Sequence, residues 1–161
     1  MLEQLTVKKA VEFAVTTEKL GAQIYDKLAK RFADQPDLVE VFSTLARDEV
    51  AHEREFKALL ERLPLEDKPL QYEQEQYLRA MAISEIFSEE KGLHRNVDSI
   101  GSRESALERV LTLEKSTLSY YQAMKDVLGP NEALDAIIQA EKRHVVQVMK
   151  YFITGEKVKS L

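Results

Sequence analysis

The sequence contains no cysteine. This excludes disulfides, thiolate metal sites, iron–sulfur clusters and a thiol nucleophile, because each of them needs a cysteine sulfur. Any metal must therefore be bound by nitrogen and oxygen atoms. The sequence also lacks an apolar run of the roughly 20 residues that cross a bilayer. Its first residues, Met1-Leu2-Glu3-Gln4, lack the charged-then-apolar pattern of a secretory signal. We therefore expect a soluble, cytoplasmic protein with no membrane partner.

Long basic runs are absent as well. The 23 Lys and Arg residues are interspersed with 28 Asp and Glu residues, which gives a net charge of −5. A nucleic acid or an anionic membrane surface is therefore not expected as a partner. A chain of 161 residues is long enough to bury a core and fits one domain, so we expect residues 1–161 to form a single domain.

Apolar residues recur every three or four positions over four long stretches, which predicts four helices at about residues 6–32, 37–63, 102–128 and 132–154. Turn signals separate the helices within each half. Asp34-Gln35-Pro36-Asp37 ends the first helix and starts the second, and Gly129-Pro130-Asn131 does the same for the third and fourth. Ser102 is a plausible N-cap for the third helix.

The connector at residues 64–101 breaks this pattern with Pro64, Pro69, Gly92 and Gly101. Its middle, residues 77–87, is too apolar for a solvated linker, so we expect a short helix there, packed on the bundle or on a partner subunit. The expected fold is all-α: a four-helix bundle of two antiparallel hairpins joined by a long crossover. The apolar connector also suggests a homodimer.

Two metal-binding residue types lie on the predicted buried face of the second helix. Glu49 and His52 fill the two steps missing from an otherwise apolar stripe. Residues three apart lie one turn apart on the same face, so the carboxylate and the imidazole can reach one point between helices. The other members of the stripe are Leu38, Phe42, Leu45, Phe56, Leu59 and Leu63.

The same pattern occurs in the second half of the chain. Glu141 and His144 repeat the Glu-x-x-His spacing, and Glu18 and Glu114 are single acids on the stripes of the first and third helices. Residues equidistant from the turn of a helical hairpin lie at the same height. The mean of 18 and 52 is 35, and the mean of 114 and 144 is 129; both fall in the predicted turns. All six residues are therefore expected at one level of the bundle.

Charge indicates how many ions such a site would hold. Four unpaired buried carboxylates would be strongly unfavourable, whereas two divalent cations balance four glutamates and leave two neutral imidazoles. Oxygen-rich coordination with one histidine per metal is typical of iron or manganese, and zinc also fits. The sequence predicts two metal ions, and we expect two iron ions.

Glu18, Glu49-x-x-His52, Glu114 and Glu141-x-x-His144 resemble the ligand set of the ferritin-like di-iron carboxylate proteins. Within that superfamily the chain is most similar to the rubrerythrin-like branch. The residues that suggest this are Glu18-Lys19 with Tyr25, Glu114-Lys115 with Tyr121, and Tyr77-Leu78-Arg79-Ala80 in the connector.

The resemblance implies that these six residues are the metal ligands. It also implies that Tyr25 and Tyr121 hydrogen-bond ligand carboxylates and that Asp48 orients a histidine by accepting its other N–H. Ala140 stands in the position of Asp48 in the second half, so the two metals are expected to be inequivalent. His94, in the polar part of the connector, is interpreted as a solvated residue and is left out of the site.

Two features differ from typical rubrerythrins. They carry a further glutamate one turn after the third-helix ligand, where this chain has Thr117. They also append a rubredoxin domain that needs four cysteines, so electrons would have to come from an external donor, such as a separate protein.

The resemblance thus implies a di-iron oxidoreductase of rubrerythrin type. It would reduce hydrogen peroxide or dioxygen with oxidation of Fe(II). Two other functions remain open at this stage: a ferritin-like protein that oxidises and sequesters iron, and a structural bundle with a zinc-filled site.

Overall fold

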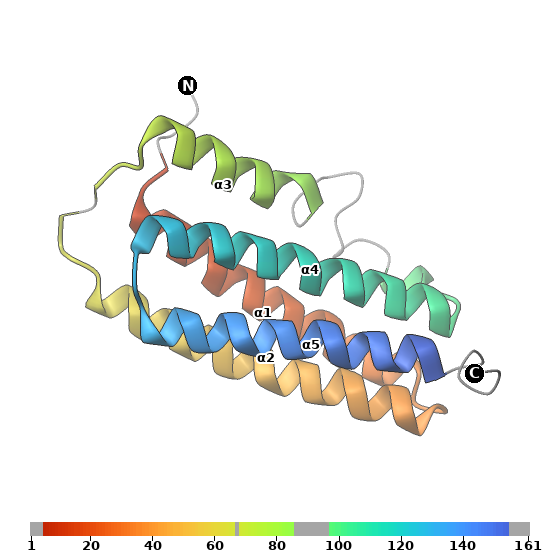
Figure 1. Ribbon diagram of the computed structural model, residues 1–161. Coiled ribbons are helices and arrows are strands. Elements are labelled where there is room, and N and C mark those ends of the chain that lie inside the picture. Colours follow the sequence, from red (N-terminus) through yellow and green to blue (C-terminus); the bar gives the residue numbers. More distant parts are fainter. Residues whose placement is uncertain (1–4, 67, 86–96, 155–161) are drawn as a thin grey trace.

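The computed structural model describes the backbone of residues 5–66, 68–85 and 97–154. Four long helices form a bundle, and a shorter helix lies outside it beside α4 (Figure 1). The fold is the predicted ferritin-like bundle, with a short helix in the crossover. In chain order the helices are α1 (Val7–Arg31), α2 (Pro36–Arg62), α3 (Tyr72–Glu85), the 3₁₀ turn η1 (Val97–Ser99), α4 (Arg103–Leu128) and α5 (Glu132–Thr154).

Local sequence signals explain where the long helices begin and end. The side chains of Thr6 and Ser102 accept hydrogen bonds from backbone N–H groups three residues later, at 3.2 and 3.1 Å. Asn131 does the same for Leu134 at 2.9 Å, and Pro36 is the first residue of α2. Gly129 ends α4 with a φ of 73°, a conformation that glycine adopts without steric penalty.

Two helical hairpins make up the bundle. The first pairs α1 with α2 and the second pairs α4 with α5, and the hairpins meet through α1–α4 and α2–α5 contacts. An ion pair of 2.6 Å between Arg103 at the start of α4 and Asp37 at the start of α2 joins them at one end. Arg31 also donates to the carbonyl of Ile100, which ties the end of α1 to the segment preceding α4.

The crossover is anchored where it leaves the first hairpin. Thr6 and Pro69 form an isolated antiparallel bridge, and the N–H of Leu70 donates to the carbonyl of Leu5 at 3.1 Å. Leu78 of α3 is fully buried in the contact with the bundle. His94 and the apolar residues Ile86 and Phe87 lie outside the described residues. None of the described helices has the length and apolar character to span a membrane.

The core consists of two hydrophobic clusters, one toward each end of the bundle. On each long helix, one segment packs in the first cluster and another in the second, and the Glu or Glu-x-x-His residues lie between them. On α2, for example, Leu45 belongs to one cluster and Phe56 to the other, with Glu49 and His52 between. The fold therefore places the polar residues in one buried layer flanked by hydrocarbon.

Candidate metal centre

The structure brings all six predicted ligand residues into this layer. Glu18 comes from α1, Glu49 and His52 from α2, Glu114 from α4, and Glu141 and His144 from α5. Their relative exposure ranges from 0% for Glu141 to 8% for His52. Charged side chains are almost never so fully buried unless they are paired or bind a metal.

The ligand atoms form two overlapping groups. One group contains Glu18, Glu49, His52 and Glu141, and the other contains Glu49, Glu114, Glu141 and His144; within each group the atoms lie within 4.8 Å of one another. Glu49 and Glu141 belong to both groups, as expected of carboxylates that bridge two metals. Each group therefore offers one imidazole and three carboxylates, which is consistent with a dimetal site.

Both imidazoles turn Nδ1 toward the carboxylates. His52 Nδ1 lies 2.9 Å from Glu141 Oε1 and 3.0 Å from Glu49 Oε2. His144 Nδ1 lies 3.2 Å from Glu114 Oε2 and 3.6 Å from Glu49 Oε1. The two rings stack with centroids 5.5 Å apart. Nδ1 is therefore the nitrogen that each histidine would present to a metal.

Burial and the neighbouring charges shift the pKa values of several groups in this layer. Burial, with the negative charges of its neighbours, raises the pKa of Glu49 and of Glu141 well above 4.5. Burial alone would lower the pKa of His52, but the carboxylates around it outweigh burial and raise that pKa to about 12. Burial alone would also lower the pKa of His144, but the hydrogen bond with Glu114 and the charge of that carboxylate outweigh burial and raise the pKa to about 9. Burial alone would raise the pKa of Glu18, but its contacts with Glu49, His52 and Tyr121 outweigh burial and lower that pKa.

Several buried oxygen atoms of this layer lack a hydrogen-bond partner. Glu18 Oε2 and both carboxylate oxygens of Glu141 are buried and form no hydrogen bond with the described residues. Buried polar atoms without a partner are rare in native proteins, and each one destabilises the fold by about 1–3 kcal/mol. Glu141 belongs to both ligand groups and Glu18 to one of them, so the donor set fits two cations.

Two tyrosines link the hairpins across the site. Tyr25 on α1 donates a short hydrogen bond to Oε1 of Glu114 on α4, and Tyr121 on α4 donates a short one to Oε1 of Glu18 on α1. Burial first, and then the charges of nearby glutamates, raise the pKa of both phenols well above 10. Each hydroxyl therefore keeps its proton and fixes the carboxylate of the opposite half. In the sequence each tyrosine follows the glutamate of its own half of the chain. Its hydrogen bond with the glutamate of the other half is therefore known only from the structure.

Asp48 contacts one histidine only. Its Oδ2 lies 3.3 Å from Nε2 of His144, on the opposite hairpin. An aspartate in this position holds the ring and makes Nδ1 a better ligand. Residue 140, the counterpart of Asp48, is an alanine, and no ion pair or hydrogen bond involves Nε2 of His52 among the described residues. The two ligand groups are therefore chemically unequal.

Sequence reasoning did not identify Gly21, which lies in α1 one turn after Glu18. A Cβ atom at this position would lie 3.6 Å from Cγ of Glu49. A cavity of about 10 Å³ lies beside it, lined among others by Glu18, Glu49 and Thr117. A glycine inside a long helix lowers helix stability by roughly 1 kcal/mol relative to alanine, and this was the available sequence signal.

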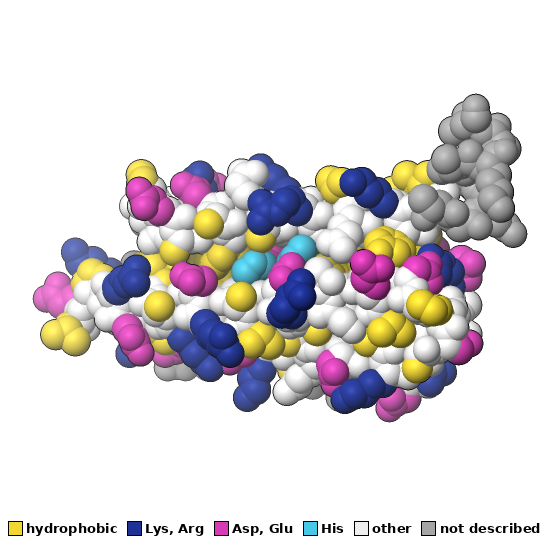
Figure 2. Space-filling model, turned by 90° about the horizontal axis from the view of Figure 1, so that it is seen from below, with side chains coloured by type: hydrophobic (Ala, Val, Ile, Leu, Met, Phe, Trp, Pro, Cys, Tyr) yellow, Lys and Arg dark blue, Asp and Glu magenta, His cyan; other side chains and the backbone are white. Residues whose placement is uncertain are grey.

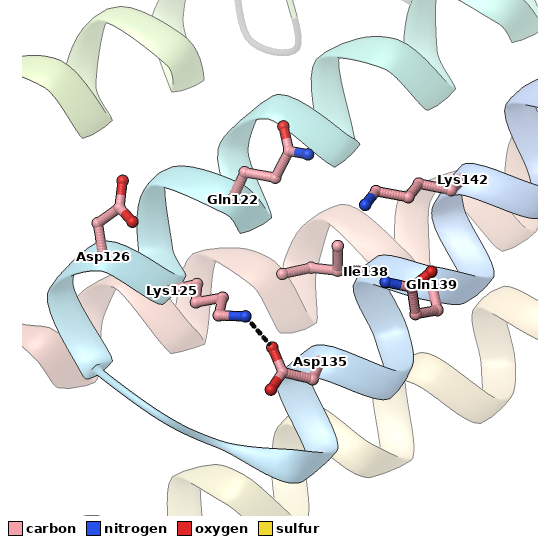
Figure 3. Close-up of a pocket in the computed structure, with 7 residues that line it drawn as sticks. All are labelled: Gln122, Lys125, Asp126, Asp135, Ile138, Gln139 and Lys142. Atoms are coloured by element: carbon pink, nitrogen blue, oxygen red, sulfur yellow. Dashed lines mark ion pairs between the residues drawn. The ribbon is translucent and has the colours of Figure 1, made fainter.

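A wider groove of about 480 Å³ lies on the surface between α4 and α5 (Figure 3). Lys125 and Asp135 form an ion pair of 2.5 Å across it, and Lys142 and Asp126 also line it. The two positive and two negative side chains balance. None of the six predicted ligands lines this groove, so it is separate from the metal centre.

Comparisons with known proteins agree with this geometry. The family model for rubrerythrin matches residues 9–152. The fold is similar to the crystal structure of a Thermotoga maritima protein described as a ferritin-like diiron-carboxylate protein, with a TM-score of 0.72 and 22% sequence identity over 97% of this chain and 99% of that one. No curated protein matches the sequence.

Proposed function

This chain belongs to the rubrerythrin family, and from that premise we propose that it is a non-haem di-iron oxidoreductase that reduces hydrogen peroxide or dioxygen. The observation that carries the proposal is the pair of buried ligand groups that share Glu49 and Glu141. The four glutamate carboxylates balance the charge of two divalent ions. Together with two imidazoles they form an oxygen-rich donor set that favours iron or manganese. Glu18 and His52 would hold one ion, Glu114 and His144 the other, and Glu49 and Glu141 both.

Two Fe(II) ions bound here would each supply one electron, and two electrons with two protons would reduce hydrogen peroxide to two waters, or dioxygen to hydrogen peroxide. The chain supplies the surroundings of that reaction. Tyr25 and Tyr121 hold their protons next to Glu114 and Glu18. The two hydrophobic clusters exclude water on both sides of the layer.

We propose that electrons come from a separate donor protein, since the sequence has no cysteine to hold a rubredoxin-type centre. The face formed by α2 and α5 is where the histidines reach the surface (Figure 2). In the described part of α5 after Glu141, the exposed charged residues are Lys142, Arg143 and Lys150, all basic, although the whole chain carries −5. An acidic patch on the donor would complement this segment of α5.

We also propose a homodimer that uses the outer face of α3, where Tyr72 and Tyr77 are 75% and 53% exposed. Large exposed aromatic side chains are enriched in protein interfaces. Sedimentation analysis is expected to give a dimer, and a monomer at all concentrations would contradict this assignment.

The test of the function is stopped-flow mixing of anaerobically iron-loaded protein with hydrogen peroxide or dioxygen. We expect rapid oxidation of both irons with one of the two oxidants, and repeated turnover when a reductant is added. Glu49→Ala and Glu141→Ala are expected to lose this reaction. Oxidation without turnover, together with iron retained in large assemblies, would favour sequestration. Purification with zinc and no oxidant reactivity would favour a structural role.

A further inference from the structure

Two small cavities lie end to end between α1 and α4. Each has a volume of about 10 Å³, enough for one water-sized molecule. Both are lined by Tyr25 and Leu113, so these two side chains form the wall between them. Tyr25 is 1% exposed and Leu113 is 4% exposed. The two cavities therefore form one interrupted path inside the bundle.

The two ends of this path differ in polarity. The inner cavity touches Glu18 and Glu49 and also the threonines Thr17 and Thr117. The outer cavity lies beneath η1 and is lined mainly by hydrocarbon side chains. These are Ile24, Leu28, Val97, Ile100 and Val110, with the half-buried Arg109 as the one charged member.

This order of polarity selects among small molecules. A charged or strongly hydrogen-bonded molecule loses its partners when it enters an apolar cavity, which is unfavourable by several kcal/mol as an order of magnitude. A neutral diatomic molecule has little hydration to lose. The outer cavity therefore disfavours hydrogen peroxide relative to dioxygen, while the inner cavity offers polar groups beside the ligand layer.

We propose that these cavities are the entry route for a neutral diatomic ligand, dioxygen in preference to hydrogen peroxide, and that Gly21 sets the size of its inner end. The route ends beside Glu18 and Glu49, on the side of the layer that faces α1 and α4. This inference rests on the proposed function for the identity of its ligand, and on the cavities alone for the path.

Gly21 makes the inner cavity testable. A Cβ at residue 21 would lie 3.6 Å from Cγ and 4.0 Å from Cδ of Glu49, and 4.0 Å from Cε2 of Tyr25, all ordinary van der Waals distances. Alanine therefore fits without displacing the ligand, and it occupies space next to the cavity. Alanine also favours a helix more than glycine does, so Gly21→Ala is expected to fold at least as well as the wild type.

The experiment measures binding of nitric oxide, a neutral diatomic molecule, to anaerobically iron-loaded protein by stopped-flow absorbance, with iron content determined for each variant. Gly21→Ala is expected to keep both irons and to slow nitric oxide association and dissociation by about tenfold or more, with unchanged affinity, because the added methyl group narrows the inner end of the route. Val110→Ile narrows the outer cavity and is expected to slow association and dissociation to the same extent, with unchanged affinity. Gly101→Ala is the matched control, because nothing lies within 4 Å of its added Cβ.

Unchanged nitric oxide association and dissociation rates in Gly21→Ala would overturn the assignment of the inner end. Unchanged rates in Val110→Ile would overturn the outer path, and failure of the wild-type protein to bind nitric oxide would overturn both. Oxidant turnover is measured separately. Normal nitric oxide binding without turnover would refute the proposed function and leave the route standing.

Discussion

Replacing Glu141 with glutamine is expected to change stability in opposite directions with and without metal. Glu141 is fully buried, its nearest polar neighbour is His52, whose Nδ1 lies 2.9 Å from Oε1 without hydrogen-bond geometry, and burial raises its pKa well above 4.5. Glutamine has nearly the same shape and no charge. It therefore removes the electrostatic penalty of the metal-free site and also removes a carboxylate that both metals would share.

The magnitude follows from proton linkage. The folded metal-free protein keeps a proton on Glu141 at pH values where the unfolded chain has released it, so the folded state loses about 1.4 kcal/mol of stability per pH unit above 4.5, until the raised pKa is reached. At pH 7 this amounts to at most about 3 kcal/mol. Metal-free Glu141→Gln is therefore expected to melt up to roughly 6–12 °C higher than wild type at pH 7, and no higher near pH 4.

The assay is thermal unfolding from pH 4 to pH 8, with and without Fe(II) or a redox-inert divalent ion. Wild-type protein is expected to gain about 4 kcal/mol from metal at 1,000 times its dissociation constant, and the variant much less. Glu108→Gln, at an exposed position of α4, is the matched control and is expected to behave as wild type. A metal-free variant that is less stable than wild type at pH 7, or one with an undiminished metal-induced gain, would refute this reasoning.

Three further predictions address the groups around the metals. Asp48→Asn is expected to weaken one of two metal-binding steps by about 10–100-fold in calorimetry, since among the described histidines Asp48 contacts His144 and not His52; equal weakening of both steps would contradict it. Metal binding is expected to release protons, as many as four from Glu49, Glu141, His52 and His144, because each has a raised pKa. The apparent metal affinity should therefore fall as the pH falls, and calorimetry in buffers of different ionisation enthalpy counts the protons that are released. An affinity that does not depend on pH would contradict this prediction. Tyr25→Phe leaves Oε1 of Glu114 without its donor and is expected to destabilise the metal-free protein by about 1–3 kcal/mol in urea unfolding; no change would indicate that the hydrogen bond is unimportant.

Periodicity was sufficient to predict the fold. The apolar stripes are long and end at strong turn signals such as Pro36 and Gly129, so little else could compete with four helices. The common height of the six candidate ligands also followed from arithmetic, since an antiparallel hairpin fixes which residues face each other. The helix in the connector was predicted from composition, and the structure places it at Tyr72–Glu85 against α4.

The side-chain contacts that join one hairpin to the other could not be predicted from the sequence. The sequence alone does not say how one hairpin is rotated against the other, and this rotation decides which histidine Asp48 meets and which glutamate each tyrosine meets. The cavity beside Gly21 could not be predicted from the sequence either, because it depends on how the side chains of α1 and α4 pack against each other.

We propose that six buried residues hold two irons as one pair. Mössbauer spectroscopy of protein loaded anaerobically with ⁵⁷Fe, then desalted and oxidised, tests it most directly when combined with metal analysis. We expect two irons per chain and a magnetically coupled diferric signal, both lost in Glu49→Ala. One iron per chain, or two irons with the spectrum of isolated ions, would contradict the account.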